Sequence, residues 1–199
     1  FVYNAFCVMS DLVTSKAGTI TSGEDRFMEW KTVDGQTEDN HFANFHVLFC
    51  GMFEQERLIE ILRDFICFSK EEKQSAKILA GYHQFYAVRK AITSVKEATT
   101  TNGKGGVFWH TQGSGKSLSM VFFAKCLQRA LSSPTIVVIT DRTDLDNQLF
   151  GQFSKCADFL RQVPVQAKSR KHLSELLDGI EANGIFFTTM QKFEEGEEP

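Results

Sequence analysis

The stretch His110-Thr-Gln-Gly-Ser-Gly-Lys-Ser117 decides the fold class of this chain of 199 residues. The apolar run Val107-Phe-Trp109 before it is typical of a strand, and residues 117–131 after it have the spacing of a helix with one apolar face. Gly113 and Gly115 allow the tight turn in which consecutive N–H groups point into one concavity, and the start of the following helix adds the positive end of its dipole. The stretch therefore predicts a P-loop, which holds the phosphates of a nucleotide.

Two side chains of this loop carry the chemistry that a bound nucleotide needs. We expect Lys116 to reach the β- and γ-phosphates, and the Ser117 hydroxyl to complete the shell of a Mg²⁺ ion that bridges them. These two are therefore the candidate catalytic residues, and Ser117 is the candidate metal ligand. The predicted nucleotide contacts within the loop are His110, Thr111, Gln112, Gly113, Ser114, Gly115, Lys116 and Ser117.

The alternative is that a flexible surface turn carries the same residues by chance. The apolar segments on both sides of the loop argue against it. The helix after the loop has a predicted buried face that comprises Met120, Phe123, Ala124, Leu127 and Leu131. The P-loop pattern usually opens with Gly, and His110 occupies that position here. Superfamily 2 helicases also lack this first Gly, whereas most small P-loop kinases keep it.

The composition fits an ordinary globular protein, with 42% hydrophobic and 24% charged residues. Lys and Arg total 22 against 25 Asp and Glu, so no general positive field favours nucleic acid and any contact with DNA must be local. Five scattered cysteines without a Cys-x-x-Cys pair argue against disulfides and zinc, and favour a reducing cytoplasm. No apolar run is long enough to predict a membrane span. Because the chain starts at Phe1 rather than Met, we expect a fragment of a longer protein.

The pattern along the chain divides it into two units. Residues 1–68 begin with strand-forming runs and end in a predicted helix over 56–68, and the polar residues 69–75 read as a linker. Residues 76–199 alternate helix and strand, which predicts an α/β fold with a parallel sheet and right-handed crossovers. The strands expected there are 107–109, 135–140 and 184–189, and the helices are 85–95, 117–131, 147–159 and 173–180.

Gln84 is the candidate reader of the nucleotide base. Its amide can pair with the N6 and N7 edge of adenine, and it precedes Lys116 by 32 residues at the start of the first helix of the second unit. On its own it would be read as a solvated residue at a helix start. The P-loop downstream favours the role in adenine binding.

Two further turns follow predicted strands and contain hydroxyl and basic side chains. Arg142 and Thr143 follow the strand over 135–140, and Thr188 and Thr189 end the strand over 184–189. Ligands of open α/β sheets bind beyond the carboxyl ends of the strands, so these four residues are candidates for contacting DNA phosphates. The alternative is helix capping, since Thr143 and Asp146 have the spacing of a capping box.

Four stretches together closely resemble the R (motor and nuclease) subunit of type I restriction enzymes: 82–88, 109–120, 139–149 and 187–193. The resemblance makes Gln84 the adenine-reading Q motif, 113–117 helicase motif I, 141–143 motif Ia, and Thr188-Thr189 the next DNA-contacting motif. Val2-Tyr-Asn-Ala5 and Arg26-Phe-Met-Glu-Trp-Lys31 are similar to the part of that family that follows the nuclease core. Leu12 stands where the family usually has Gly.

The resemblance implies an incomplete RecA-like, superfamily 2 helicase-type P-loop domain, preceded by the strand-rich tail of a PD-(D/E)xK-type nuclease domain. The intact protein would be an ATP- and Mg²⁺-dependent type I site-specific deoxyribonuclease that translocates double-stranded DNA in a cytoplasmic complex with methylation and specificity subunits. The family's nuclease carboxylates would lie before Phe1 and its Asp-Glu pair after Pro199, so we expect this chain alone to be inactive. The alternatives are a small P-loop nucleotide or metabolite kinase and a non-catalytic nucleotide-binding module.

Overall fold

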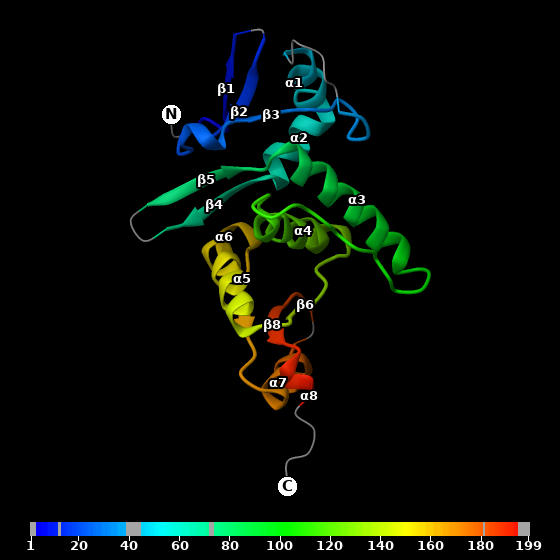
Figure 1. Ribbon diagram of the computed structural model, residues 1–199. Helices are drawn as coiled ribbons and strands as arrows, with labels where there is room; N and C mark the ends of the chain where they lie inside the picture. Colours follow the sequence, from blue (N-terminus) through cyan, green and yellow to red (C-terminus); the bar gives the residue numbers. More distant parts are fainter. Residues whose placement is uncertain (1–2, 12, 39–44, 72–73, 181, 195–199) are drawn as a thin grey trace.

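The computed structural model describes residues 3–11, 13–38, 45–71, 74–180 and 182–194 (Figure 1). Leu12, which stands where the resembled family usually has Gly, lies outside the described residues, as do residues 195–199. The described part is mixed α/β with a parallel sheet, as the sequence predicts. None of its helices has the length and apolar character needed to cross a membrane.

The first unit contains a small antiparallel sheet, which confirms that the start of the chain is rich in strands. Its strands are β1 (Cys7–Ser10), β2 (Ser15–Gly18) and β3 (Met28–Glu29), paired in the order β1-β2-β3. A short 3₁₀ helix (Glu24–Arg26) precedes β3, and the helices α1 (Phe45–Met52) and α2 (Gln55–Asp64) follow it. The Glu54 side chain caps α2 by accepting hydrogen bonds from the N–H groups of Glu56 and Arg57 at 3.1 and 2.9 Å.

A β-hairpin replaces the expected end of the 56–68 helix and the expected linker. Strand β4 (Ile66–Lys70) pairs antiparallel with β5 (Ser75–Leu79). A strand forms here because burial alternates from one residue to the next. Cys67 and Ser69 are buried while the neighbouring Phe68 and Lys70 are exposed, and this two-residue period is that of a strand. Polar residues at 69–75 therefore end a strand and form a turn, and they do not mark a free linker. The division into domains at 1–68 and 76–199 stays a prediction.

The second unit surrounds a parallel sheet in the order β6-β8-β7. The predicted strands over 135–140 and 184–189 are confirmed, and a short third strand completes the sheet. The elements are α3 (Tyr82–Ala98), α4 (Lys116–Ala130), β6 (Ile136–Thr140), α5 (Thr143–Lys155), α6 (Ala157–Leu160), β7 (Val165–Gln166), α7 (Arg170–Asp178), β8 (Ile185–Thr189) and α8 (Gln191–Glu194).

Residues 107–109 do not form the predicted strand. They belong to an irregular segment in which the side chains of Val107 and Trp109 are 97% and 80% exposed. A strand needs a neighbouring backbone to bond with, and no described segment pairs with this one. The buried face of α4 also differs from the prediction. Val121 and Phe122 are buried in place of Met120, because α4 packs against α3 as well as against α5 and α6.

One hydrophobic core runs through both units. Trp30 of the first unit contacts Phe85 on α3 with ring centroids 5.6 Å apart, and Phe65 touches both Phe85 and Phe122 of α4 at 4.7 and 5.7 Å. The same cluster continues to Phe187 in β8. The helix α3, which carries Gln84, is thus packed between the first unit and α4, the helix that follows the predicted P-loop.

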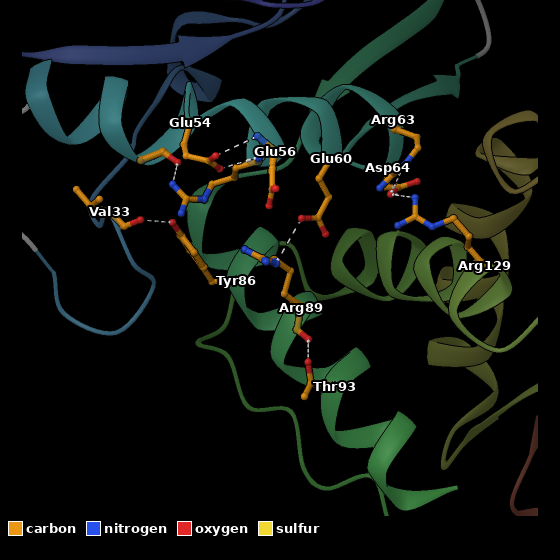
Figure 2. A network of polar contacts seen from close by, with 12 residues as sticks. Val33, Glu54, Glu56, Glu60, Arg63, Asp64, Tyr86, Arg89, Thr93 and Arg129 are labelled. Carbon is orange, nitrogen blue, oxygen red and sulfur yellow. Dashed lines mark hydrogen bonds and ion pairs between the residues drawn. The ribbon is translucent and has the colours of Figure 1, made fainter.

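Polar contacts reinforce this packing along α2 (Figure 2). Glu60 pairs with Arg89 of α3 at 3.4 Å, and the buried Asp64 accepts hydrogen bonds from Arg63 and from Arg129 of α4. The Tyr86 hydroxyl donates to the Val33 carbonyl oxygen at 2.9 Å. Helix α2 therefore fixes both helices that position the loop at 110–117.

Candidate nucleotide-binding site

The loop at 110–117, which the sequence predicts to be a P-loop, has the backbone conformation that its glycines predict. Gly113 and Gly115 have φ angles of +80° and +78°, in the left-handed region that other residues adopt only with strain. At Gly115 a Cβ atom would also lie 2.9 Å from Gln84 Nε2. Any side chain at either position would therefore disturb the turn into α4.

The start of α4 presents a cluster of backbone donors. The helix begins at Lys116, with Gly115 as an N-cap residue that offers no side-chain cap. Within the described part of the chain, no acceptor pairs with the N–H groups of Gly115, Lys116, Ser117 or Leu118. Such a cluster, together with the positive end of the helix dipole, suits an anion with several oxygens, which is the chemistry of a phosphate chain.

Lys116 folds back over the loop that precedes it. Its exposed ammonium group donates to the carbonyl oxygens of His110 and Thr111 at 2.9 and 3.0 Å. Ser114 braces the same loop, because its hydroxyl donates to the Thr111 carbonyl oxygen at 2.8 Å. Ser117 is half-buried in the first turn of the helix. The predicted phosphate and Mg²⁺ ligands thus lie together at one end of α4.

Gln84 lies beside this loop, but its amide is fully engaged inside the protein. Oε1 accepts from the Gly81 N–H at 3.0 Å, and Nε2 donates to the Gly115 carbonyl oxygen at 3.1 Å and to Ser119 Oγ at 3.3 Å. The residue is only 4% exposed. Gln84 would have to give up these bonds before its amide could pair with adenine, so this arrangement places it as a brace between α3 and α4.

Two histidines lie close together at the loop: His110, which the sequence predicts as a nucleotide contact, and His83, to which the sequence assigns no role. His83 Nε2 lies 3.1 Å from the Ser114 carbonyl oxygen, and the rings of His83 and His110 are 5.4 Å apart. His110 Nδ1 is buried without a partner among the described residues. Burial lowers the pKa of His110, and the nearby His83 and Lys116 lower it further. The contact of His83 could not be predicted from a sequence pattern, because its partner, Ser114, lies 31 residues away along the chain.

A cavity of about 720 Å³ opens between α3, α4 and residues 105–110. Its walls are largely apolar and include Val95, Phe108, Met120 and Phe123, while the side of Lys116 borders it. Its volume lies in the range of small-molecule sites. No group of His, Cys, Asp and Glu in the described residues could hold a metal ion by itself.

The candidate DNA contacts divide by accessibility. Arg142 and Thr143 are exposed before and at the start of α5, whereas Thr188 and Thr189 are buried within β8. Thr140 pairs in register with Thr189, so the two strand ends lie side by side at the carboxyl edge of the sheet. Only the exposed pair therefore offers side chains to a partner in this conformation.

The capping box expected from Thr143 and Asp146 is wrong. Arg142 holds the N-cap position without a side-chain cap, and Thr143 is the first helical residue. The Asp146 carboxylate is buried, and it accepts hydrogen bonds from Thr140 Oγ1 at 3.2 Å and from Gln166 Nε2 at 2.5 Å. A partner 20 residues downstream thus replaces the local backbone, and α5 starts earlier than the predicted residue 147.

Comparison with known proteins shows which proteins this chain is similar to. A family model described as SWI2/SNF2 ATPase matches residues 83–199. The type I restriction enzyme HindI endonuclease subunit of Haemophilus influenzae is 42% identical over 100% of this chain, and the putative MjaIXP endonuclease subunit of Methanocaldococcus jannaschii is 35% identical over 97% of it. The type I restriction enzyme SauCOLORF180P endonuclease subunit of Staphylococcus aureus is 28% identical over 68% of the chain.

The chain covers 20% of the length of the first two relatives and 16% of the third. The similarity runs through the loop, the helices that hold it and the first unit. The chain therefore belongs to the SWI2/SNF2 ATPase family and is similar throughout to endonuclease subunits of type I restriction enzymes.

Proposed function

We propose that this chain binds ATP with Mg²⁺ through the loop at 110–117, as the first part of the motor of a type I restriction endonuclease subunit. The observation that carries the proposal is that the N–H groups of residues 115–118 have no acceptor among the described residues, next to Gly113 and Gly115 with their positive φ angles and to Lys116. A P-loop uses the same donors for the phosphates of its nucleotide.

Each residue of the loop has a role in this proposal. The N–H groups at the start of α4 bind the phosphate oxygens, and Lys116 exchanges the carbonyl oxygens of His110 and Thr111 for the β- and γ-phosphates. The Ser117 hydroxyl holds Mg²⁺, which when bound neutralises charge on those phosphates. Thr111, Gln112, Gly113 and Ser114 shape the loop around the phosphate chain. Hydrolysis itself would need further groups from the longer protein.

In the intact protein, ATP hydrolysis would drive movement along double-stranded DNA, which the same protein would cut. Arg142 and Thr143 are exposed at the carboxyl edge of the sheet and would contact DNA phosphates there, with Thr188 and Thr189 supporting the edge from within β8. Residues 1–68 would be the tail of the nuclease domain. We expect methylation and specificity subunits as partners, and the cytoplasm as the location.

The loop can be tested by calorimetric titration of the full chain with ATP and Mg²⁺. Lys116→Ala should abolish detectable binding, because it removes the point charge that faces two phosphates. Lys96→Ala, which removes an exposed Lys from α3, is the matched control and should leave affinity unchanged. Equal affinity for the wild type and Lys116→Ala would overturn the assignment of the P-loop.

A further inference from the structure

Two consecutive side chains at the start of α3 hold two consecutive carbonyl groups of the P-loop. His83 Nε2 lies 3.1 Å from the Ser114 carbonyl oxygen, and Gln84 Nε2 lies 3.1 Å from the Gly115 carbonyl oxygen. A carbonyl oxygen can only accept, so His83 Nε2 must carry the hydrogen. Helix α3 is therefore hydrogen-bonded to the two loop residues immediately before α4.

These hydrogen bonds from α3 set the direction in which the backbone N–H groups of the loop point. In a trans peptide unit the C=O and N–H groups point in opposite directions, and none of the described peptide bonds is cis. Because the Ser114 carbonyl group points toward His83, the N–H group of Gly115 points away from α3. The Gly115 carbonyl oxygen accepts from Gln84 Nε2 and, at 3.0 Å, from the Ser119 N–H, and these two bonds together direct the Lys116 N–H of the next peptide unit the opposite way. These are the first two of the four donors at residues 115–118 that lack an acceptor among the described residues.

The His83 ring is itself fixed by its surroundings. It is half-buried, it meets the Tyr82 ring edge to face at 5.5 Å, and it lies 5.4 Å from the His110 ring. At Gly81 a Cβ atom would come within 2.9 Å of the His83 ring, so the imidazole packs directly against the helix N-cap. A ring held on three sides presents its Nε2 donor in one direction.

We propose that His83 is a positioning residue of the phosphate site, which orients the Gly115 N–H toward a bound phosphate by holding the Ser114 carbonyl oxygen. The inference rests on the proposed function, since it concerns the same loop. His83 does not touch the nucleotide. Its contribution comes from preorganising a donor that an anion would otherwise have to orient itself.

If His83 has this role, its substitution should lower the affinity for phosphate ligands to the same extent whether or not the ligand carries a base. We would titrate the full chain with ATP, GTP and inorganic tripolyphosphate, each with Mg²⁺. His83→Phe keeps an aromatic ring but removes the hydrogen-bond donor. It should lower the affinity for all three ligands equally, by about 2- to 10-fold, as expected for the loss of one neutral hydrogen bond. His83→Gln places an amide N–H at roughly the reach of Nε2 and should restore most of the affinity.

Two further variants complete the test. His83→Asn is polar but too short to reach Ser114, so it should behave like His83→Phe and provides a second measurement if the aromatic variant folds poorly. His46→Phe changes an exposed histidine on α1 and should bind all three ligands like the wild type.

Each other outcome has a distinct meaning. If His83→Phe and His83→Asn both bind tripolyphosphate as well as the wild type does, the positioning role is wrong. A loss confined to ATP would also overturn it, because His83 would then act on the base. If the wild type binds none of the three ligands, the proposed function itself fails and the role of His83 fails with it.

Discussion

Gln84 Nε2 donates a hydrogen bond to the Gly115 carbonyl oxygen at 3.1 Å, which joins the start of α3 to the residue that caps α4. Its second N–H is directed at Ser119 Oγ, and its oxygen accepts from the Gly81 N–H. An amide has two N–H donors, so no donor is left for a base. The side chain that the sequence assigns to adenine thus forms structural contacts with the proposed phosphate site.

Gln84→Ala should therefore lower the affinities for ATP and for GTP to a similar extent, so that the ratio of the two affinities stays unchanged. It should also lower the free energy of unfolding by about 1–3 kcal/mol, because it leaves the buried Gly81 N–H without its acceptor and removes the hydrogen bond that Ser119 Oγ accepts. Competition binding and urea unfolding measure the two effects. Gln148→Ala, at an exposed position of α5, is the control and should change neither. If the substitution instead removes a preference for ATP over GTP, Gln84 reads the base after releasing Gly115.

How far the sequence determines the site depends on how local each feature is. The loop between Gly113 and Ser117 could be predicted, because positive φ angles and a helix start need particular residues at adjacent positions. The strands at 136–140 and 185–189 were also predictable, since long apolar runs between helices favour a parallel sheet.

Features that depend on distant partners could not be found in the same way. Asp146 has capping-box spacing, but its carboxylate is bound by Gln166 and Thr140. His83 and Gln84 meet the loop across 31 residues. Residues 107–109 look like a strand because they are apolar, yet whether they join a sheet depends on a neighbouring backbone. Sequence patterns report burial and local geometry, whereas these contacts are products of packing.

The buried carboxylate of Asp64 should matter more to stability than exposed ion pairs do. Asp64 has a side chain that is 4% exposed, and it accepts from Arg63 on α2 and Arg129 on α4 (Figure 2). Asp64→Ala should lower the free energy of unfolding by about 1–3 kcal/mol, because it removes the charged hydrogen bond from Arg129 that links α2 to α4, together with the one from Arg63 within α2. Urea unfolding measures this change.

The comparison for Asp64 is the exposed pair between Asp158 and Lys70, where the Asp side chain is 70% exposed. Asp158→Ala should change the free energy of unfolding by less than about 0.5 kcal/mol, since solvent already screens that pair. Equal effects of the two substitutions would show that the Asp64 network does not join the helices energetically.

Alkaline solution should destabilise the fold through Cys126 on α4. Burial, and after it the negative charges of Asp64 and Glu60, raises the pKa of Cys126 to about 12. The unfolded thiol ionises near pH 8.5, so between about pH 9 and pH 12 the folded state binds the extra proton and the free energy of unfolding falls as pH rises, by up to about 1.4 kcal/mol per pH unit for one such group. Below about pH 8 the thiol is protonated in both states, so its contribution to the free energy of unfolding is fully present there.

Cys126→Ala tests this linkage, because it removes the titrating thiol and should make the decline at alkaline pH shallower. Urea unfolding at several pH values from about pH 8 to about pH 11 gives the slope. Tyr82 should leave a residual slope, since burial and a hydrogen bond to Glu38 raise its pKa to about 12 as well. Cys50→Ala, at an exposed position, is the control. An identical slope for the wild type and Cys126→Ala would contradict the prediction.

Arg142 should govern the response to DNA without affecting ATP. Its side chain is 77% exposed and forms only a long ion pair, of 3.9 Å, with the exposed Asp141 among the described residues, so it can bind a phosphate at the carboxyl edge of the sheet. In the longer protein, Arg142→Ala should keep the affinity for ATP but raise the DNA concentration that half-saturates ATP hydrolysis. A lost phosphate contact lowers the salt dependence of DNA binding by about one unit of slope and weakens all DNA sequences alike. Arg26→Ala, on the first unit, is the charge-matched control. A DNA requirement and salt slope unchanged by Arg142→Ala would mean that this turn only begins α5.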